Sequence, residues 1–310
     1  MVIRDYISGD EVKIIELFKL AFNKELSIEY WRWRFVQNPL NKIQIKLMFD
    51  DDKLVGHYAV SPQELLVNGG KVRAALSMTT MTHPEYTGKG IFTQLASDLY
   101  KSYFSKGELS IVYGFPNANS HYGFINKLGW KDVQVIPTLS CIDFKKDDFS
   151  SVVKITKFTD IHHESYLSVV KNYSVALNRT AEWFNWRYFN NPSGDYAAYE
   201  IQTDNGIDFI VGKLFRNGGT TELDICEFIS INPKLTATKL ISALVNHFGD
   251  FTIDKINTWI PDEDIRRQSL SEIGFELAEP KTQLGWLCMD ESLGNITNGF
   301  YFSMGDSDIY

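Results

Sequence analysis

The sequence lacks the features that mark secreted and membrane proteins. Its three cysteines, Cys141, Cys226 and Cys288, are far apart and odd in number. They suit a reducing compartment and form neither a disulfide framework nor a paired zinc motif. No apolar run approaches the roughly 20 residues of a transmembrane helix, and the first residues contain no apolar segment typical of a secretory signal. We therefore expect a cytoplasmic protein without a membrane partner.

Basic residues are fewer than acidic ones, with 31 Lys and Arg against 39 Asp and Glu. The formal net charge is −8 and the isoelectric point is about 5.3, which argues against nucleic acid or an anionic membrane as the main partner. The histidines show no metal-binding spacing with cysteines or carboxylates, so we expect no metal site. Apolar and aromatic side chains are plentiful, at 44% and 14% of the 310 residues. This is enough for one large domain or two of ordinary size.

The two halves of the chain share a pattern. EYWRWRFVQNP (29–39) returns 153 residues later as EWFNWRYFNNP (182–192), and NGG at 68–70 returns 149 residues later at 217–219. A small drift of the offset is expected where loops differ in length between duplicated domains. The sequence therefore predicts an internal duplication.

The expected helices and strands repeat as well. Residues 91–99 carry an apolar stripe of helical spacing, and the stripe returns in residues 240–248, 149 positions later. Strand-like runs come before and after each helix, at 75–82 and 109–116 in the first half and at 223–230 and 254–261 in the second. We predict an α/β fold with domains at 1–148 and 149–290, followed by a C-terminal tail at 291–310.

The loop TGKGIF (87–92) joins a predicted strand to a predicted helix. The first N–H groups of a helix have no partner within the helix, and glycine lets a phosphate approach the backbone closely. Gly88 and Gly90 lie at this junction, with Lys89 between them. No GxxxxGK[ST] string surrounds them, and the GxGxxG pattern fails at Thr93. The loop is predicted to bind a phosphate or pyrophosphate.

The segment HPEYTGKGIFTQL resembles the acyl-CoA pyrophosphate loop of the GNAT superfamily of N-acyltransferases. The family pattern [Q/R]-x-x-G-x-[G/A] falls on residues 87–92, where Gly90 matches, Thr87 replaces the usual Arg or Gln, and Phe92 replaces a small residue. The segment NANSHYGFINKLGW (117–130) is similar to the family segment that closes over the pantetheine arm, with Asn119 as a match.

The resemblance implies two tandem GNAT-like domains, each a mixed, largely antiparallel sheet flanked by helices, with acyl-CoA as co-substrate. The residues that it implies for acyl-CoA are Met81 and Thr82, through the main chain of a splayed strand, and Thr87, Gly88, Lys89, Gly90, Ile91, Phe92 and Asn119. The second loop has Ala237 and Lys239 in place of the two glycines. One acyl-CoA site is therefore expected, in the first half. The second half is expected to shape an acceptor pocket or a subunit interface, which would allow a homodimer.

Acyl transfer to an amine needs a neutral amine, stabilisation of the oxyanion and a proton for the leaving thiolate. His83, beside the loop, is the first candidate base, although a histidine before proline is often only a turn residue. Glu85, His121 and a base-free route through water are alternatives. Ile125 occupies the place of the family's tyrosine acid, so Tyr122 is the candidate acid. The aromatic stretch WRWRF recurs in the half without a glycine loop, so we expect it to serve in packing.

The tail GFYFSMGDSDIY (299–310) resembles those of tandem-GNAT proteins encoded for surface-polysaccharide synthesis. Members of that group transfer an acyl group from CoA to the amine of a nucleotide-linked amino sugar. The resemblance implies such an acceptor, with Asp306, Asp308 and His121 as substrate contacts. Two other functions stay open, an aminoacyl-tRNA-dependent transferase acting on cell-wall precursors and a non-catalytic acyl-CoA-binding module.

Overall fold

The computed structural model describes residues 1–192, 194–262, 264–293, 296, 299–308 and 310. These residues form two units: Met1–Gln134 with Gln283–Thr297, and Val135–Thr282 with Asn298–Tyr310. Among the described residues, none of the helices has the length and apolar character needed to cross a membrane.

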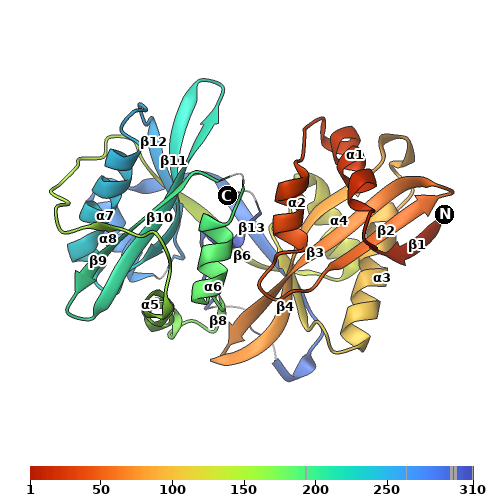
Figure 1. The fold of residues 1–310 in the computed structure, drawn as a ribbon. Helices are drawn as coiled ribbons and strands as arrows, with labels where there is room; N and C mark the ends of the chain where they lie inside the picture. The colour runs from red at the N-terminus through yellow and green to blue at the C-terminus, as the bar shows by residue number, and fades with distance from the viewer. Residues whose placement is uncertain (193, 263, 294–295, 297–298, 309) are drawn as a thin grey trace. The chain divides into compact units, whose positions relative to one another are not determined.

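The first unit contains a mixed sheet with helices on both faces. Its elements are β1 (Val2–Asp5), α1 (Glu11–Phe22), α2 (Ile28–Phe35), β2 (Gln44–Asp50), β3 (Lys53–Val67), β4 (Gly70–Thr82), a 3-10 turn (Pro84–Tyr86), α3 (Ile91–Ser105), β5 (Ile111–Gly114), α4 (Ala118–Leu128) and the start of β6 (Lys131–Cys141) (Figure 1). The strand order is β1-β2-β3-β4-β5-β13, where β13 is Glu276–Cys288. β4 and β5 are parallel, and the other neighbours are antiparallel.

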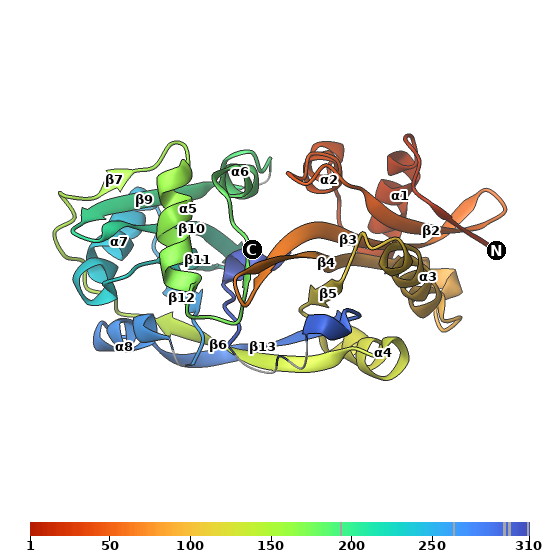
Figure 2. The same ribbon diagram turned by 90° about the horizontal axis from the view of Figure 1, so that it is seen from below.

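Two apolar clusters hold the first unit together. One joins α1 and α2 to the sheet and includes Ile14, Trp31 and Met81. The other joins α3 and α4 to the opposite face and includes Leu95 and Phe124. Figure 2 shows α1 and α2 on one side of β3 and β4, and α4 on the other. The apolar stripe predicted for the helix after the glycine loop is confirmed, because it forms the buried side of α3.

The second unit repeats this order of elements. They are β7 (Val153–Lys154), α5 (Asp160–Val170), β8 (Val175–Leu177), α6 (Ala181–Phe184) with a π-helical turn (Asn185–Phe189), β9 (Tyr196–Thr203), β10 (Gly206–Asn217), β11 (Thr220–Ile229), α7 (Pro233–His247), β12 (Lys255–Trp259), α8 (Ile265–Glu272), the start of β13 (Glu276–Cys288) and a 3-10 turn at Met304–Asp306. A further 3-10 turn, Glu291–Leu293, belongs to the first unit. The strand order is β6-β12-β11-β10-β9-β7, with β11 and β12 parallel. An origin of this order in a duplicated sequence stays a prediction.

Each unit's last strand, β6 in the first and β13 in the second, begins in its own unit and ends in the other. The last part of β6 pairs with β12, from Ile256↔Cys141 to Trp259↔Thr138, and the last part of β13 pairs with β5. The units therefore differ from the predicted ranges 1–148, 149–290 and 291–310. Residues 135–148 belong to the second unit and residues 283–297 to the first, because strand pairing, rather than the polar stretch after β6, divides the chain.

Candidate functional site

A bulge interrupts β4 shortly before the glycine loop. The register between β3 and β4 shifts between His57 and Ala59, and Thr79 takes a φ of 51°, which is unusual for a non-glycine residue. His57 Nδ1 lies 2.7 Å from the Thr79 carbonyl oxygen. Burial lowers the pKa of His57 to about 4, so the ring is neutral and its Nδ1–H donates to that carbonyl. This hydrogen bond holds the bulge in place.

The ladder between β4 and β5 ends just before the bulge. Their parallel pairing runs from Ala74↔Ile111 to Leu76↔Tyr113, whereas β4 continues to Thr82. The main chain around Met81 and Thr82 therefore lies past the last ladder pair with β5. The Met81 side chain is buried under α1 and α2, so only its main chain is placed to serve the predicted role.

The loop after β4 leaves the N-terminus of α3 open. Gly88 and Gly90 have φ values of 76° and 70°, in the left-handed region that favours glycine. Gly90 is the N-cap of α3, and no side chain caps the helix. Thr87, Gly88, Lys89 and Gly90 are all exposed. Uncapped N–H groups at an exposed helix N-terminus form a geometry suited to an anion, because the helix dipole adds partial positive charge there.

Side chains around the loop stabilise its shape. The Thr87 hydroxyl donates to the Pro84 carbonyl at 3.1 Å, and the Lys89 ammonium lies 4.2 Å from the Tyr86 ring centre. The Tyr86 hydroxyl in turn donates to Asp50 at 2.8 Å. The carbonyl of Lys89 accepts a hydrogen bond from Gln94 at 3.1 Å. The loop is thus held in shape by hydrogen bonds and by the contact of the Lys89 ammonium with the Tyr86 ring.

Phe92 and Ile91 face the protein and not the loop surface. Ile91 is buried in the core, and the half-buried Phe92 ring lies 4.9 Å from the ring of Phe124 and 5.9 Å from that of Tyr58. A Cβ at Gly123 would lie 2.8 Å from Phe92, so this glycine on α4 makes room for the ring. A large residue at the family's small position is accommodated by a glycine on the neighbouring helix, a pairing that the loop sequence alone does not reveal.

His83 and Glu85 are tied into the turn before the loop. His83 is 7% exposed, and its Nδ1 accepts a hydrogen bond from the Glu85 N–H at 3.3 Å. Glu85 forms an ion pair with Lys53 at 2.7 Å. These contacts are those of a turn residue and a surface ion pair. They do not select either residue as a base, and that role stays a prediction.

Helix α4 carries the remaining candidates of the first unit. Asn117 caps it by accepting the N–H groups of Asn119 and Ser120 at 3.0 and 3.1 Å, and the Asn119 side chain is exposed. Tyr122 is 63% exposed. His121 Nε2 lies 2.8 Å from Asp132 Oδ1. Asn117 was missed as the capping residue, although an asparagine just before a helical pattern is a recognisable signal.

The two tail carboxylates predicted to contact substrate differ in burial: Asp306 is buried and Asp308 is exposed. Asp306 is 2% exposed and forms a buried ion pair with Arg179 at 2.5 Å. It also accepts the Ser303 N–H at 2.7 Å. Its charge is therefore neutralised inside the second unit, where it holds the tail and cannot reach a substrate without breaking these bonds. Asp308 is exposed.

The repeated aromatic stretches pack in cores, as predicted. Trp31 and Trp33 on α2 are fully buried, as is Trp186 in the second unit. Arg187, beside Trp186, donates to the main-chain oxygens of Gly305 and Ser307 at 3.1 and 3.3 Å and also to that of Tyr310. The second copy therefore anchors the tail.

Among the described residues of the second unit, the junction of β11 and α7 forms no open glycine loop. Its helix α7 begins at Pro233, so the positions matching the glycines, Ala237 and Lys239, lie within the helix. The buried guanidinium of Arg266 donates to the Phe228 carbonyl, just past the end of the β11–β12 ladder. In the second unit, α7 thus takes the position of the glycine loop. The Arg266 side chain takes the position beside β11 that corresponds to the end of the β4–β5 ladder. This geometry supports a single acyl-CoA site.

Comparison with known proteins bears on both units. Residues 2–133 match the family model of the acetyltransferase (GNAT) domain. The first unit contains a GNAT acetyltransferase domain. The predicted acyltransferase class and α/β fold are thereby confirmed. The family uses acyl-CoA as co-substrate, which agrees with the expected cofactor.

Three solved structures are similar in fold to most of the chain. A GCN5-related N-acetyltransferase from Anabaena variabilis ATCC 29413 is 15% identical, covers 94% of this chain and 74% of its own, and has a TM-score of 0.72. A probable N-acyltransferase from Enterococcus faecalis V583 has 14% identity, coverage of 92% and 71%, and a TM-score of 0.68. A GCN5-related N-acetyltransferase from Kribbella flavida is 14% identical, covers 94% of this chain and 72% of its own, and has a TM-score of 0.67. No curated protein matches the chain.

Within the GNAT domain, Tyr122 gives a direct test of the predicted thiolate acid. Replacing Tyr122 with phenylalanine removes the only proton-donating group of this side chain and is expected to lower the turnover number by about 100-fold, the lower end of general acid catalysis. Steady-state release of the CoA thiol measures this. Because the side chain is exposed, folding should be unaffected, and an unchanged turnover number would end the assignment.

Proposed function

We propose that the protein is an acyl-CoA-dependent N-acyltransferase that acylates a primary amine. The observation that carries the proposal is the uncapped N-terminus of α3, where Gly88 and Gly90 expose main-chain N–H groups to an anion. With its pyrophosphate docked there, CoA would direct its thioester arm toward the part of β4 that lies past the last pair with β5. The main chain past the last β4–β5 pair then offers N–H groups to the developing oxyanion.

The proposed acceptor is a nucleotide-activated amino sugar used in surface-polysaccharide synthesis. Its support is the resemblance of the tail around Asp306 and Asp308 to those of proteins with this activity. Because Asp306 is 2% exposed, we propose that it acts by shaping the second unit and not by contacting the acceptor. Asp308 and His121 stay proposed contacts.

A thiol-release assay tests this function. Acetyl-CoA and longer acyl-CoA compounds would be combined with a panel of nucleotide-linked amino sugars, simple primary amines and buffer alone. The proposal expects amine-dependent release of one equivalent of CoA per acylated product, fastest with a nucleotide-linked amino sugar. Activity only with aminoacyl-tRNA would favour the cell-wall alternative, and CoA binding without release by any amine would favour a binding module. Either result would overturn the proposal.

A further inference from the structure

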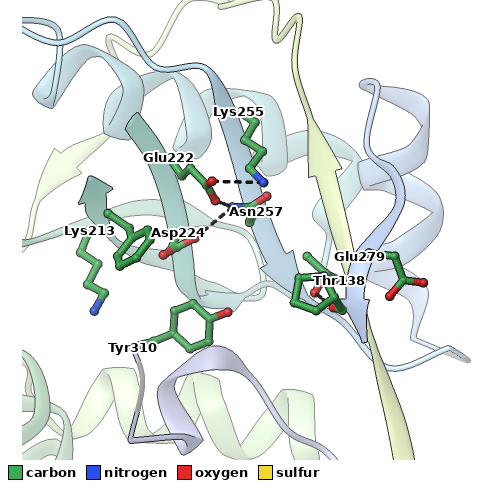
Figure 3. A pocket seen from close by; sticks show the side chains of 10 residues that line it. Thr138, Lys213, Glu222, Asp224, Lys255, Asn257, Glu279 and Tyr310 are labelled. Carbon is green, nitrogen blue, oxygen red and sulfur yellow. Dashed lines mark hydrogen bonds and ion pairs between the residues drawn. The ribbon is translucent and has the colours of Figure 1, made fainter. Parts of the chain in front are cut away.

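A hollow of about 230 Å³ lies within the second unit, far from the glycine loop in sequence (Figure 3). One side of its wall comes from three adjacent strands, with Lys213 and Phe215 from β10, Glu222 and Asp224 from β11, and Lys255 and Asn257 from β12. Thr138 from β6, Glu279 and Pro280 from β13, and Tyr310 complete the wall. At roughly 30 Å³ per water molecule, the hollow has room for about eight waters. It therefore suits a small molecule.

Strand register explains why these polar groups meet. Lys213 lies directly opposite Asp224 across the β10–β11 ladder, and Asp224 is the register partner of Asn257 on β12. Successive side chains of a strand point to opposite faces. The residues that alternate with Asp224, Leu223 and Ile225, lie in the apolar cluster under α7. The polar face of the sheet is therefore opposite that cluster.

Glu222 and Asp224 are the two carboxylates on this face. Glu222 forms an ion pair with a lysine, and Asp224 forms none with the described residues. Glu222 lies 3.2 Å from the Lys255 ammonium and accepts the Asn257 amide at 2.7 Å. Asp224 is 3% exposed, and its carboxylate accepts one hydrogen bond, 3.1 Å long, from the same neutral amide. No cation of the described residues lies within ion-pair distance of Asp224. Ser140 donates to the Asn257 amide oxygen at 2.6 Å and so fixes which way the amide points.

The Lys213 ammonium acts on Asp224 through its charge but forms no ion pair with it. It lies 5.7 Å from the Tyr196 ring centre and 5.9 Å from that of Tyr310, although it faces the hollow. Burial raises the pKa of Asp224 to about 6, despite the amide and the nearby lysines. A carboxylate in such a position is costly to keep charged unless a cation arrives from outside the protein.

We propose that this hollow binds a small organic ammonium ion, with Asp224 as its counter-ion and the Tyr310 ring as part of its wall. An ammonium group can donate to the carboxylate oxygen that Asn257 leaves unused. An aromatic wall favours such a cation through its electron-rich face. The proposal concerns binding alone, so it does not depend on the acyl transfer proposed above.

Other occupants fit the hollow less well. The Asn257 amide donates to both carboxylates, so a metal ion placed between them would meet amide hydrogens where it needs lone pairs. The described residues contain no group of three histidine, cysteine, aspartate or glutamate side chains placed to hold a metal. An anion would be repelled by the Asp224 carboxylate, on which Lys213 and Lys255 act only from a distance.

Saturation-transfer NMR on the full chain, without acyl-CoA, tests the proposal. The probes are propylammonium, its neutral analogue 1-propanol and its anionic analogue propanoate, at pH 7.5. Only propylammonium is expected to bind the wild type, and Asp224→Asn is expected to weaken its binding at least tenfold. The matched control is Asp208→Asn, since Asp208 is a buried carboxylate of the same unit that already accepts the hydroxyls of Ser230 and Thr236. This control should bind like the wild type.

A folding check accompanies the binding test. Asp224 is protonated more readily in the folded chain than in the unfolded chain, so its charge opposes folding above pH 6 and has no effect below about pH 4. The unfolding midpoint of Asp224→Asn should therefore equal or exceed that of the wild type at pH 7.5. Equal binding of propylammonium and 1-propanol, or unchanged binding by a folded Asp224→Asn, would overturn the proposal.

Two sources of the ammonium group can be distinguished. In the thiol-release assay, a raised KM for the acceptor amine in Asp224→Asn would identify the ammonium as that of the acceptor. Lost propylammonium binding with an unchanged KM would identify a separate ligand. Absence of transfer with every amine would contradict only the proposed function, because Asp224-dependent binding is measured without any reaction.

Discussion

Replacing Gly90 with valine is expected to weaken CoA binding at least about 100-fold, which corresponds to about 2.7 kcal/mol. Gly90 has a φ of 70°, and a β-branched residue in this region is strained by about 1–3 kcal/mol. A Cβ at this position would meet no protein atom closer than 3.6 Å. The loss would therefore come from a changed loop backbone and from side-chain bulk beside the N–H groups, not from a clash within the core.

The matched control is Lys239→Val in the second unit, at the position that corresponds to Gly90. Lys239 lies within α7, where valine costs only a few tenths of a kcal/mol in helix propensity. Isothermal titration of both variants with CoA compares them directly. The account predicts loss in Gly90→Val and wild-type affinity in Lys239→Val. Equal losses in the two variants would mean that the single-site assignment is wrong.

Replacing Arg179 with methionine is expected to lower the free energy of unfolding by about 3–5 kcal/mol. Arg179 is fully buried and donates to Glu227 and, at 2.5 Å, to Asp306. Burial already raises the pKa of Glu227 although Arg179 opposes the shift. Without the guanidinium, two carboxylates would share a site that excludes water, and one or both would have to take up a proton on folding.

Urea denaturation at pH 7.5 measures this loss, and the surface pair of Arg267 and Asp262 provides the comparison. Asp262 is 65% exposed, so Arg267→Met should cost less than about 1 kcal/mol. The loss in Arg179→Met should shrink as the pH falls, because protonation removes the uncompensated charges. Similar small effects for the two variants would contradict the role of Arg179 in anchoring the tail.

Local patterns predicted the parts of the fold that depend on nearby residues. Apolar periodicity identified α3, and the glycine loop marked the junction with β4. The shared aromatic stretches were correctly interpreted as packing elements. Each of these inferences rests on contacts within a few positions of the chain, where spacing translates directly into which side chains share a face.

Contacts between distant residues could not be predicted in this way. The Thr79 bulge depends on His57, 22 positions away, and nothing in either local sequence indicates it. Asp306 was expected as a substrate contact, and nothing near it in the sequence indicates its partner Arg179, 127 positions earlier. The exchange of the closing strands was also hidden, because β6 and β13 have the same local character whichever sheet they complete. The hollow at Asp224 arises from register across β10, β11 and β12.

The central claim is that CoA binds through the main-chain N–H groups at the start of α3 in the first unit. The most direct measurement is a titration of isotope-labelled protein with CoA, following backbone amide signals by NMR. The account predicts saturable shifts for the amides of residues 88–92 and none for those of residues 233–241. Shifts confined to residues 233–241, or a saturated complex in which the amides of residues 88–92 do not move, would contradict it.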